Sequence, residues 1–434
     1  MLKDKSLGIE RIAMSRVPEE KRQNWYSIAF IWIGIMIAVP ALMVAGAFAG
    51  TMTFQNIVLA TFIGYGVIAV TMSLISIISS DLGIPATMAA SKGFGDSGSN
   101  YIISIIFIIG CIGWFAVQTA ACAAAFSMLM SFVGIENFPI WAGAVIWGTV
   151  MLITSVTGFS YLKWINYITV PFLVFVCAYG AYYAVSHTGF DAVLAHSPQE
   201  QMPLTAAISI CIGMMAVGAV VSGDYSRYSK NRKHTIAASV GGILPVAIFM
   251  YAIGAIMAIC VQESDIVMIF AGLGFPVFGM LVLIIATWTT NTGNAYIAGL
   301  AAMKISGLRD ELRPRVTFIV GILGIVLALT GIADALISFI SIISAVTPSV
   351  AGVMIADYWI IGKGKPENWY RVKGFNWIGI IAWIIGSIIA LFFSFFSPGL
   401  DSIITATIAY LILFAIFGKT SLAGQGRMPL PDEE

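Results

Sequence analysis

Long apolar segments alternate with short polar connections along almost the whole chain. From Trp25 nearly to the C-terminus, apolar windows recur at about the 20 residues that a helix needs to cross a hydrocarbon core ~30 Å thick. Lipid offers the backbone no hydrogen-bond partners, so a crossing segment must be a helix or a strand of a closed barrel. The run 101–132 is too long and too continuously apolar for barrel strands of about ten alternating residues. The pattern predicts an all-α polytopic membrane protein.

The apolar windows predict twelve transmembrane helices. Their approximate ranges are 25–49, 54–80, 99–132, 138–156, 164–186, 204–226, 235–261, 269–303, 315–334, 335–361, 375–397 and 401–418. The connections between them are short, so no soluble domain is expected. The first range is of full span length and follows a charged segment, so we expect it to remain in the mature protein.

Two of these spans contain helix-breaking residues at corresponding places. In span one, Pro40 lacks a backbone donor and frees a carbonyl one turn earlier. In span six, Gly213 and Gly218 permit close approach and unwinding. Interrupted helices in matching positions of two halves are typical of carrier binding sites. The alternatives are a simple kink at Pro40 and glycines that serve helix packing.

The spacing of the two breaks, five spans apart, predicts a domain organisation of two five-helix repeats with opposite membrane orientation. The first repeat covers 25–186 and the second covers 187–361. Two additional helices follow at 362–418, and the tails are 1–24 and 419–434.

Composition supports the membrane assignment and excludes other classes. Hydrophobic residues make up 59% of the chain and charged residues only 10%, against about 25% in ordinary soluble domains. The net charge of +1 provides no basic surface for nucleic acid. The five cysteines fall inside apolar windows without metal-type spacing, so we expect them to pack as small hydrophobes.

The distribution of positive charge predicts the orientation. With the N-terminus inside, all 22 Lys and Arg residues fall in the two tails or in the connections that follow even-numbered spans. Acidic residues such as Asp191, Glu200 and Glu263 fall in the outside connections. We therefore predict a multi-pass protein of the bacterial inner membrane with both termini in the cytoplasm.

Span eight holds the densest polar run inside an apolar segment, at 288–294. Thr289 and Thr290 offer hydroxyl oxygens, and Asn291 and Asn294 offer both donors and acceptors. Thr289 lies three residues after Ala286, on the same helical face. Beside freed carbonyls of span one, such as those of Ala38 and Ala41, these hydroxyls would form the all-oxygen environment that a hard cation prefers. The alternative is hydrogen bonding that only ties helices together.

Span three places Trp114 and Gln118 one helical turn apart on the same face. An indole can stack on a flat ring, and a carboxamide can read the edge of an amide-like heterocycle. The alternative is a packing tryptophan with a locally paired glutamine.

No Asp, Glu, His, Lys or Arg lies near the centre of any predicted span. A buried partner for a charged solute is therefore missing, and so is a central proton relay. The sequence predicts a neutral solute and favours Na⁺ over H⁺ as the coupling ion. We expect the bilayer and a small molecule as partners, with no nucleic acid and no obligate protein partner.

Several segments resemble the nucleobase:cation symporter family, in particular its bacterial cytosine permease and purine/cytosine permease-like branch. They are 113–115 in span three, 213–228 in and after span six, 288–291 in span eight, and 356–358 at the end of span ten. The resemblance covers nearly the whole chain. It implies a leucine-transporter-type fold of inverted repeats with broken helices one and six, which works by alternating access.

The resemblance also implies functions for individual residues. Na⁺ would lie among the backbone oxygens of Ala38, Ala41 and Ala286 and the hydroxyls of Thr289 and Thr290. The substrate would stack on Trp114, with Asn291 or Asn294 reading its edge. Backbone groups near Gly213 to Gly218 would complete the site.

The chain departs from the cytosine permease pattern at three candidate binding positions. Met215 and Val217 stand where cytosine permeases have Phe and Ser. Gln118 stands where they have Gly, whereas hydantoin and allantoin carriers have Gln. Cytosine or a related nucleobase is the leading expectation, and an allantoin, a hydantoin or a similar amide-like heterocycle is the alternative, with proton coupling as a variant.

Two other classes of protein are alternatives to a symporter. A passive channel for a small neutral solute usually has a continuous pore rather than broken helices in two repeats. A membrane enzyme would need a nucleophile, a metal cluster or paired carboxylates, and the sequence shows no such set. We therefore predict a transporter and not an enzyme.

Overall fold

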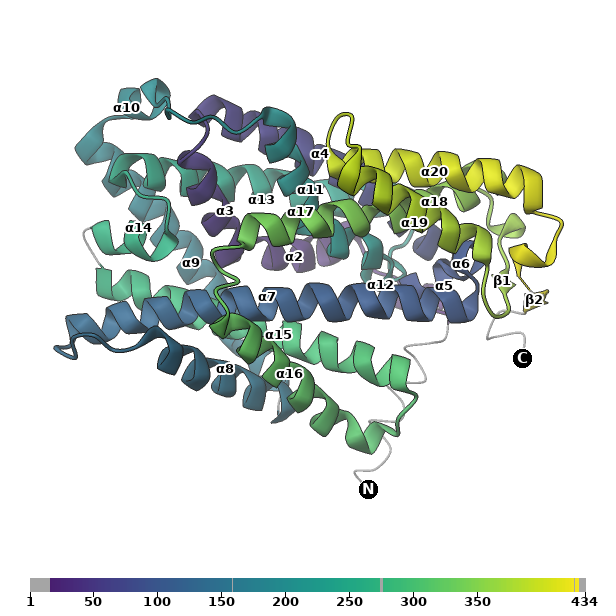
Figure 1. Cartoon of the computed structure of the whole chain (residues 1–434), viewed down its shortest axis with the longest axis horizontal. Coiled ribbons are helices and arrows are strands. Elements are labelled where there is room, and N and C mark those ends of the chain that lie inside the picture. Colours follow the sequence, from purple (N-terminus) through teal and green to yellow (C-terminus); the bar gives the residue numbers. More distant parts are fainter. Residues whose placement is uncertain (1–15, 158, 274–275, 425, 429–434) are drawn as a thin grey trace.

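The computed structural model describes residues 16–157, 159–273, 276–424 and 426–428. It is an elongated bundle of helices whose long members run roughly along its length (Figure 1). The all-helical prediction is confirmed: outside the helices, the described residues form one two-stranded sheet and short connections.

The helices of the first half follow the predicted spans closely. They are α2 (Trp25–Met36), α3 (Val39–Ala49), α4 (Phe54–Leu82), α7 (Asp96–Phe132), α8 (Ile140–Thr157) and α9 (Phe159–Thr188). Those of the second half and the C-terminal pair are α11 (Leu204–Val221), α13 (Arg232–Val261), α15 (Pro276–Ser306), α16 (Arg313–Leu329), α17 (Leu336–Val346), α18 (Pro348–Ile355) with η3 (Ala356–Ile361), α19 (Trp377–Phe392) and α20 (Pro398–Phe417).

Short elements lie in the connections. They are α5 (Ala86–Ala89), α6 (Ser91–Phe94), α10 (Phe190–Ala195), α12 (Gly223–Ser226), α14 (Ile266–Gly272), the 3-10 turns η1 (Glu19–Lys21), η2 (Asp310–Leu312), η4 (Pro366–Asn368) and η5 (Ser421–Ala423), and strands β1 (Arg371–Val372) and β2 (Arg427–Met428). The two strands pair antiparallel, with Arg371 opposite Met428.

Within the described residues, eight helices are long and apolar enough to cross a membrane, and the bent pair α2 and α3 makes a ninth. Two shorter apolar helices lie at Ile140–Val156 and Trp377–Phe392. Each of the twelve predicted ranges coincides with a helix or a series of joined helices, but the number of spans that cross the bilayer stays a prediction.

Polar side chains set several helix starts. The side-chain oxygens of Thr53, Asn231, Asn376 and Ser397 each accept a backbone N–H from the first turn of α4, α13, α19 and α20, respectively. A helix start leaves its first N–H groups without partners in the helix, so these oxygens stabilise the point where each span begins.

The predicted break in span one is confirmed. Helices α2 and α3 meet at an angle of 54°. Pro40 has no N–H to continue the ladder, and the N–H of Ala38 bonds instead to the Met36 carbonyl at 3.0 Å.

The predicted break in span six at Gly213 and Gly218 is wrong. Helix α11 runs without interruption through both glycines, and the chain turns only at Ser222, before the short α12. This stretch contains no proline, so every backbone donor remains available to the helix. A Cβ at Gly213 would lie 2.6 Å from the Ile340 carbonyl oxygen. That glycine therefore serves close packing of α11 against α17.

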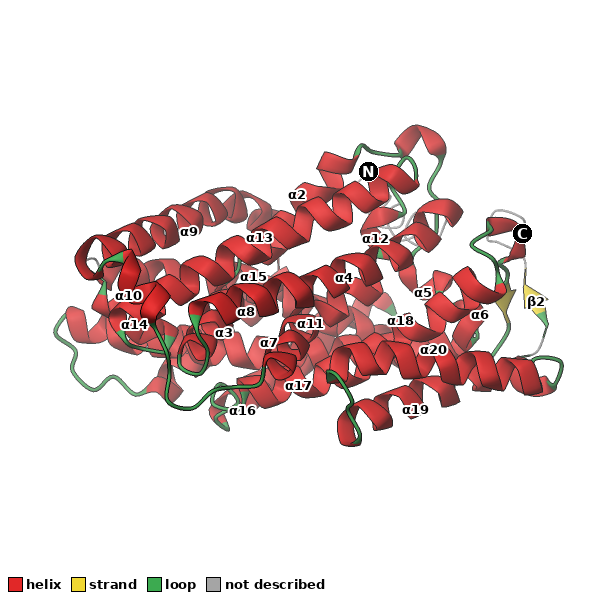
Figure 2. Ribbon diagram, turned by 90° about the horizontal axis from the view of Figure 1, so that it is seen from above, coloured by secondary structure: helices red, strands yellow, loops and turns green. Residues whose placement is uncertain are grey.

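The packing order places α7 and α15 side by side at the centre, with α16 and α8 against them. Helix α4 packs on α11 and α13, and α13 also packs on α2 and α3. Helices α19 and α20 pack on each other, on the opposite side of the bundle from α2, α9 and α13 (Figure 2). The division of the chain into two five-helix repeats and these two additional helices stays a prediction.

One end of the bundle gathers α5, α6, α12 and both strands (Figure 1). There the ammonium of Lys92 lies 3.4 Å from the Asp357 carboxylate, and both side chains are buried. The Tyr410 hydroxyl donates to the same carboxylate at 3.1 Å. This contact joins α6, η3 and α20 at the end of the molecule that holds the basic connections.

Replacing Asp357 by alanine is expected to lower the thermal unfolding midpoint by several degrees. The change leaves the buried Lys92 ammonium without its anion, and removing one partner of a buried ion pair costs about 3–5 kcal/mol. The double variant Lys92→Met/Asp357→Leu should recover most of the loss, because neither charge remains. Equal midpoints for Asp357→Ala and the unsubstituted protein in detergent would contradict this account.

Candidate substrate and cation site

The candidate site is built on the interface between α7 and α15. Helix α7 carries Trp114 and Gln118, and α15 carries the polar run from Ala286 to Asn294. The two helices pack against each other along their length, so the structure brings together the two motifs that the sequence placed in separate spans.

Gln118 presents a free acceptor inside the protein. The side chain is only 2% exposed, and its Oε1 atom has no hydrogen-bond partner. A buried polar atom without a partner costs about 1–3 kcal/mol, so it is seldom retained without a use. A bound molecule with an N–H group would satisfy this oxygen.

Trp114 is half-buried and has an aromatic neighbour that the sequence analysis missed. Phe339 of α17 meets the indole edge-on, with ring centroids 5.5 Å apart and an angle of 85° between the planes. Phe339 lies in an ordinary apolar stretch without a motif, so only the packing of α17 could reveal its position. Its neighbour Ile340 contacts α11 at Gly213, so α17 links the span-three and span-six parts of the site.

Gly113 makes room for Phe339. A Cβ at Gly113 would collide with the Phe339 ring. The glycine of the 113–115 motif therefore allows an aromatic side chain to approach the backbone of α7.

Gly113→Ala is expected to displace Phe339 from Trp114 and to weaken substrate binding about tenfold, while the protein still folds. The ring must rotate away, because the clashing atoms belong to a side chain and not to the backbone. Gly66→Ala on α4 is the matched control, since a Cβ there meets nothing within 4 Å. Equal affinities in Gly113→Ala and the control would show that the Phe339 position is irrelevant to binding.

Of the four predicted residues of span six, Gly213 and Val217 contact neighbouring helices. Gly213 packs on Ile340, and Val217 lies against Gly110, one turn before Trp114. Met215 is buried, and its side chain lies over Gly218. The thioether thus covers part of the segment whose backbone groups are predicted to complete the substrate site.

Asn291 and Asn294 are joined to each other. The Asn294 Nδ2 atom donates to Asn291 Oδ1 at 3.1 Å, and Asn291 is fully buried while Asn294 is half-buried. Asn294 therefore retains an exposed part that Asn291 lacks.

The predicted cation ligands of α15 form one cluster. The hydroxyls of Thr289 and Thr290 both donate to the Ala286 carbonyl, at 3.0 and 2.9 Å. Each hydroxyl proton points at this carbonyl, which leaves the hydroxyl lone pairs available to a cation. Helix α3, which begins at the break in span one, also contacts α15.

The break also defines which oxygens of span one are free. The Ala38 carbonyl accepts the Ala41 N–H at 3.2 Å, and Ala41 itself lies in the first turn of α3. Among the described residues, no hydrogen bond is found to the carbonyls of Gly34, Ile35 and Ile37. Ala38 and Ala41 stay predictions as ion ligands, and these three carbonyls join them as candidates.

Metal sites of the usual protein type are not found in the described part of the chain, where no three His, Cys, Asp or Glu side chains gather. The oxygens around Ala286 are neutral, which suits a weakly held monovalent cation better than a tightly bound divalent one.

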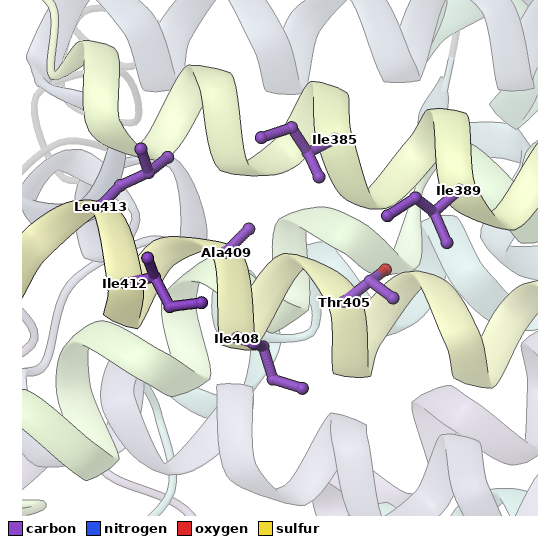
Figure 3. A pocket seen from close by; sticks show the side chains of 7 residues that line it. All are labelled: Ile385, Ile389, Thr405, Ile408, Ala409, Ile412 and Leu413. Atoms are coloured by element: carbon purple, nitrogen blue, oxygen red, sulfur yellow. The ribbon is translucent and has the colours of Figure 1, made fainter.

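A shallow groove between α19 and α20 is distinct from this site (Figure 3). Its lining residues are Ile385, Ile389, Thr405, Ile408, Ala409, Ile412 and Leu413. Ile408 and Ile412 are more than half exposed, so this surface suits contact with lipid chains.

Fold and site together define a membrane transporter. A family model described as a permease for cytosine/purines, uracil, thiamine and allantoin matches residues 16–417. The chain belongs to this family, the nucleobase:cation symporters, as the sequence resemblance predicted. It is a transporter and not an enzyme.

Individual relatives span nearly the whole chain. The cytosine permease of Escherichia coli K12 is 25% identical and covers 94% of this chain and 95% of its own length. The hydantoin permease of Microbacterium maritypicum is 24% identical, and the match covers 91% of this chain and 85% of that permease. The inward-facing structure of Mhp1 superposes with a TM-score of 0.80 at 20% identity over 92% of this chain and 91% of Mhp1, which shows a shared fold.

Proposed function

We propose that this protein is a secondary active symporter that imports a neutral planar heterocycle of the nucleobase type together with Na⁺. The observation that carries the proposal is the buried, unpaired Oε1 atom of Gln118, one turn from Trp114 on α7. A flat molecule stacked on the indole would bring a ring N–H to this oxygen.

The site favours an uncharged substrate that carries an amide. Gln118 offers a carboxamide, which pairs in register with the N–H and C=O groups of a ring amide. Cytosine and related bases have such an edge, and so do hydantoins and allantoin, the alternative class within the family. Met215 and Val217 leave the span-six wall without a second stacking ring, and Phe339 supplies an aromatic edge from α17 instead.

Na⁺ is proposed to bind between the Ala286, Thr289 and Thr290 cluster and the carbonyls at the break of span one. Support comes from the neutral oxygen atoms of both segments, and from the lack of Asp, Glu, His, Lys and Arg near the centre of the predicted spans. Transport would proceed by alternating access of the two proposed repeats, 25–186 and 187–361.

The basic connections lead us to propose that the end with α5, α6 and α12 faces the cytoplasm of a bacterium, with both termini on the same side of its inner membrane.

A binding screen tests the proposal. Purified protein is heated with cytosine, uracil, adenine, hypoxanthine, allantoin or a hydantoin, in NaCl and in matched KCl. One planar compound is expected to raise the unfolding midpoint, and to do so more strongly in NaCl, because a ligand that binds only the folded state stabilises it. No shift with any compound in either salt would contradict the proposed substrate class.

A further inference from the structure

Asn291 adjoins the candidate ion ligand Thr290 on α15, and its side chain bonds to the turn of α7 that carries Trp114 and Gln118. We propose that Asn291 is a positioning residue that transmits Na⁺ occupancy on α15 to Trp114 and Gln118 on α7. The inference rests on the proposed function and names a mechanism for its coupling.

The side chain of Asn291 is fully buried, and all its polar atoms are engaged. Its Nδ2 atom lies 2.9 Å from the Phe115 carbonyl oxygen, 3.0 Å from Thr119 Oγ1 and 3.2 Å from Met151 Sδ. Its Oδ1 atom accepts the amide of Asn294 at 3.1 Å. A substrate could bind to Asn291 only by displacing one of these partners, so Asn291 is poorly placed to read the substrate edge.

The two closest acceptors of the Asn291 amide belong to residues of α7 that adjoin Trp114 and Gln118. Phe115 directly follows Trp114, and Thr119 directly follows Gln118. The Asn291 amide thus spans the same helical turn that presents the stacking ring and the free amide oxygen. A displacement of Asn291 must move or rotate this turn, since both hydrogen bonds join the same amide nitrogen to it.

On α15, Asn291 directly follows Thr290, whose hydroxyl bonds the Ala286 carbonyl. A cation that draws the Thr289 and Thr290 oxygens and this carbonyl inward would fix the turn of α15 that ends at Asn291. Fully engaged buried polar groups transmit such shifts because breaking any one of their bonds leaves an unpaired atom. The ion and the substrate groups would therefore be coupled without direct contact.

The test uses Na⁺ alone as the probe and needs no known substrate. The protein is labelled with 5-fluorotryptophan, and the ¹⁹F resonance of Trp114 is assigned by its loss in Trp114→Phe. NaCl is titrated at constant ionic strength with KCl, and thermal stabilisation by NaCl is measured on the same samples.

Asn291→Leu removes the amide while keeping a similar volume. The expected result is that NaCl still stabilises this variant, with a midpoint concentration within about threefold of the unsubstituted protein, while the Na⁺-dependent shift of the Trp114 resonance falls about tenfold. Thr119→Val removes only one of the bonds and should lose about half of the shift. If Asn291→Leu does not fold, Thr119→Val alone tests the inference.

Thr154→Val is the matched control. It removes the acceptor of the Trp288 indole N–H, at 3.2 Å, and so a hydrogen bond from the same helix α15 to α8. Its Trp114 response should be unchanged.

Two results would overturn the inference. A full Trp114 response in Asn291→Leu and Thr119→Val would show that Asn291 only holds helices together. Loss of stabilisation by NaCl in Asn291→Leu would assign the residue to the ion site itself. Absence of any Na⁺ effect in the unsubstituted protein is a separate outcome. It would refute Na⁺ coupling, and with it the proposed transmission through Asn291.

Discussion

Replacing Trp114 by alanine is expected to weaken binding of the planar substrate by about tenfold to 100-fold. Stacking of a ring on an aromatic side chain contributes about 1–3 kcal/mol, and loss of the indole also opens the wall against which Phe339 packs. Isothermal titration with the compound selected in the screen measures the change.

The control for this variant is Trp141→Ala, because Trp141 is 65% exposed at the start of α8 and lies outside the α7 and α15 interface. Its affinity should stay within about twofold of the unsubstituted protein. Retained affinity in Trp114→Ala would remove the indole from the substrate site.

The double variant Thr289→Ala/Thr290→Ala is expected to require at least about tenfold more Na⁺ for substrate binding. Two neutral oxygen ligands are lost, whereas α15 keeps its backbone bonds and the Ala286 carbonyl. Substrate affinity at saturating NaCl should recover toward the unsubstituted value, since the groups on α7 are untouched.

Thr292→Ala serves as the comparison. Its hydroxyl bonds the Trp288 carbonyl at 2.8 Å in the same way, one turn further along α15. If the double variant and Thr292→Ala show the same Na⁺ dependence, the hydroxyls of Thr289 and Thr290 are not ion ligands.

The helices were predictable from the sequence because long apolar runs admit few structures in lipid. The break at Pro40 was predictable for a chemical reason, the missing N–H. The glycines of span six do not force a break, because glycine allows a helix either to unwind or to pack closely against a neighbour. In this structure, the close approach of Ile340 to Gly213 shows packing. Glycine therefore predicts a helix break ambiguously, whereas the missing N–H of proline predicts it definitely.

Side chains of the candidate site were predictable where a polar group inside an apolar span costs free energy. The polar run at 288–294 and the Trp114 and Gln118 pair are conspicuous in apolar spans. Phe339 was not predictable, because a phenylalanine in an apolar helix carries no signal of its own. The engagement of Asn291 with α7 depends on how α7 and α15 pack, which no spacing within either segment reveals.

Uptake into proteoliposomes tests the central claim most directly. Protein reconstituted in vesicles is supplied with the radiolabelled heterocycle under an inward NaCl gradient, and in parallel under a matched KCl gradient and an inward proton gradient. The account predicts saturable accumulation above the external concentration with NaCl alone. Simple equilibration in all three conditions would indicate a channel, and accumulation driven only by the proton gradient would contradict Na⁺ coupling.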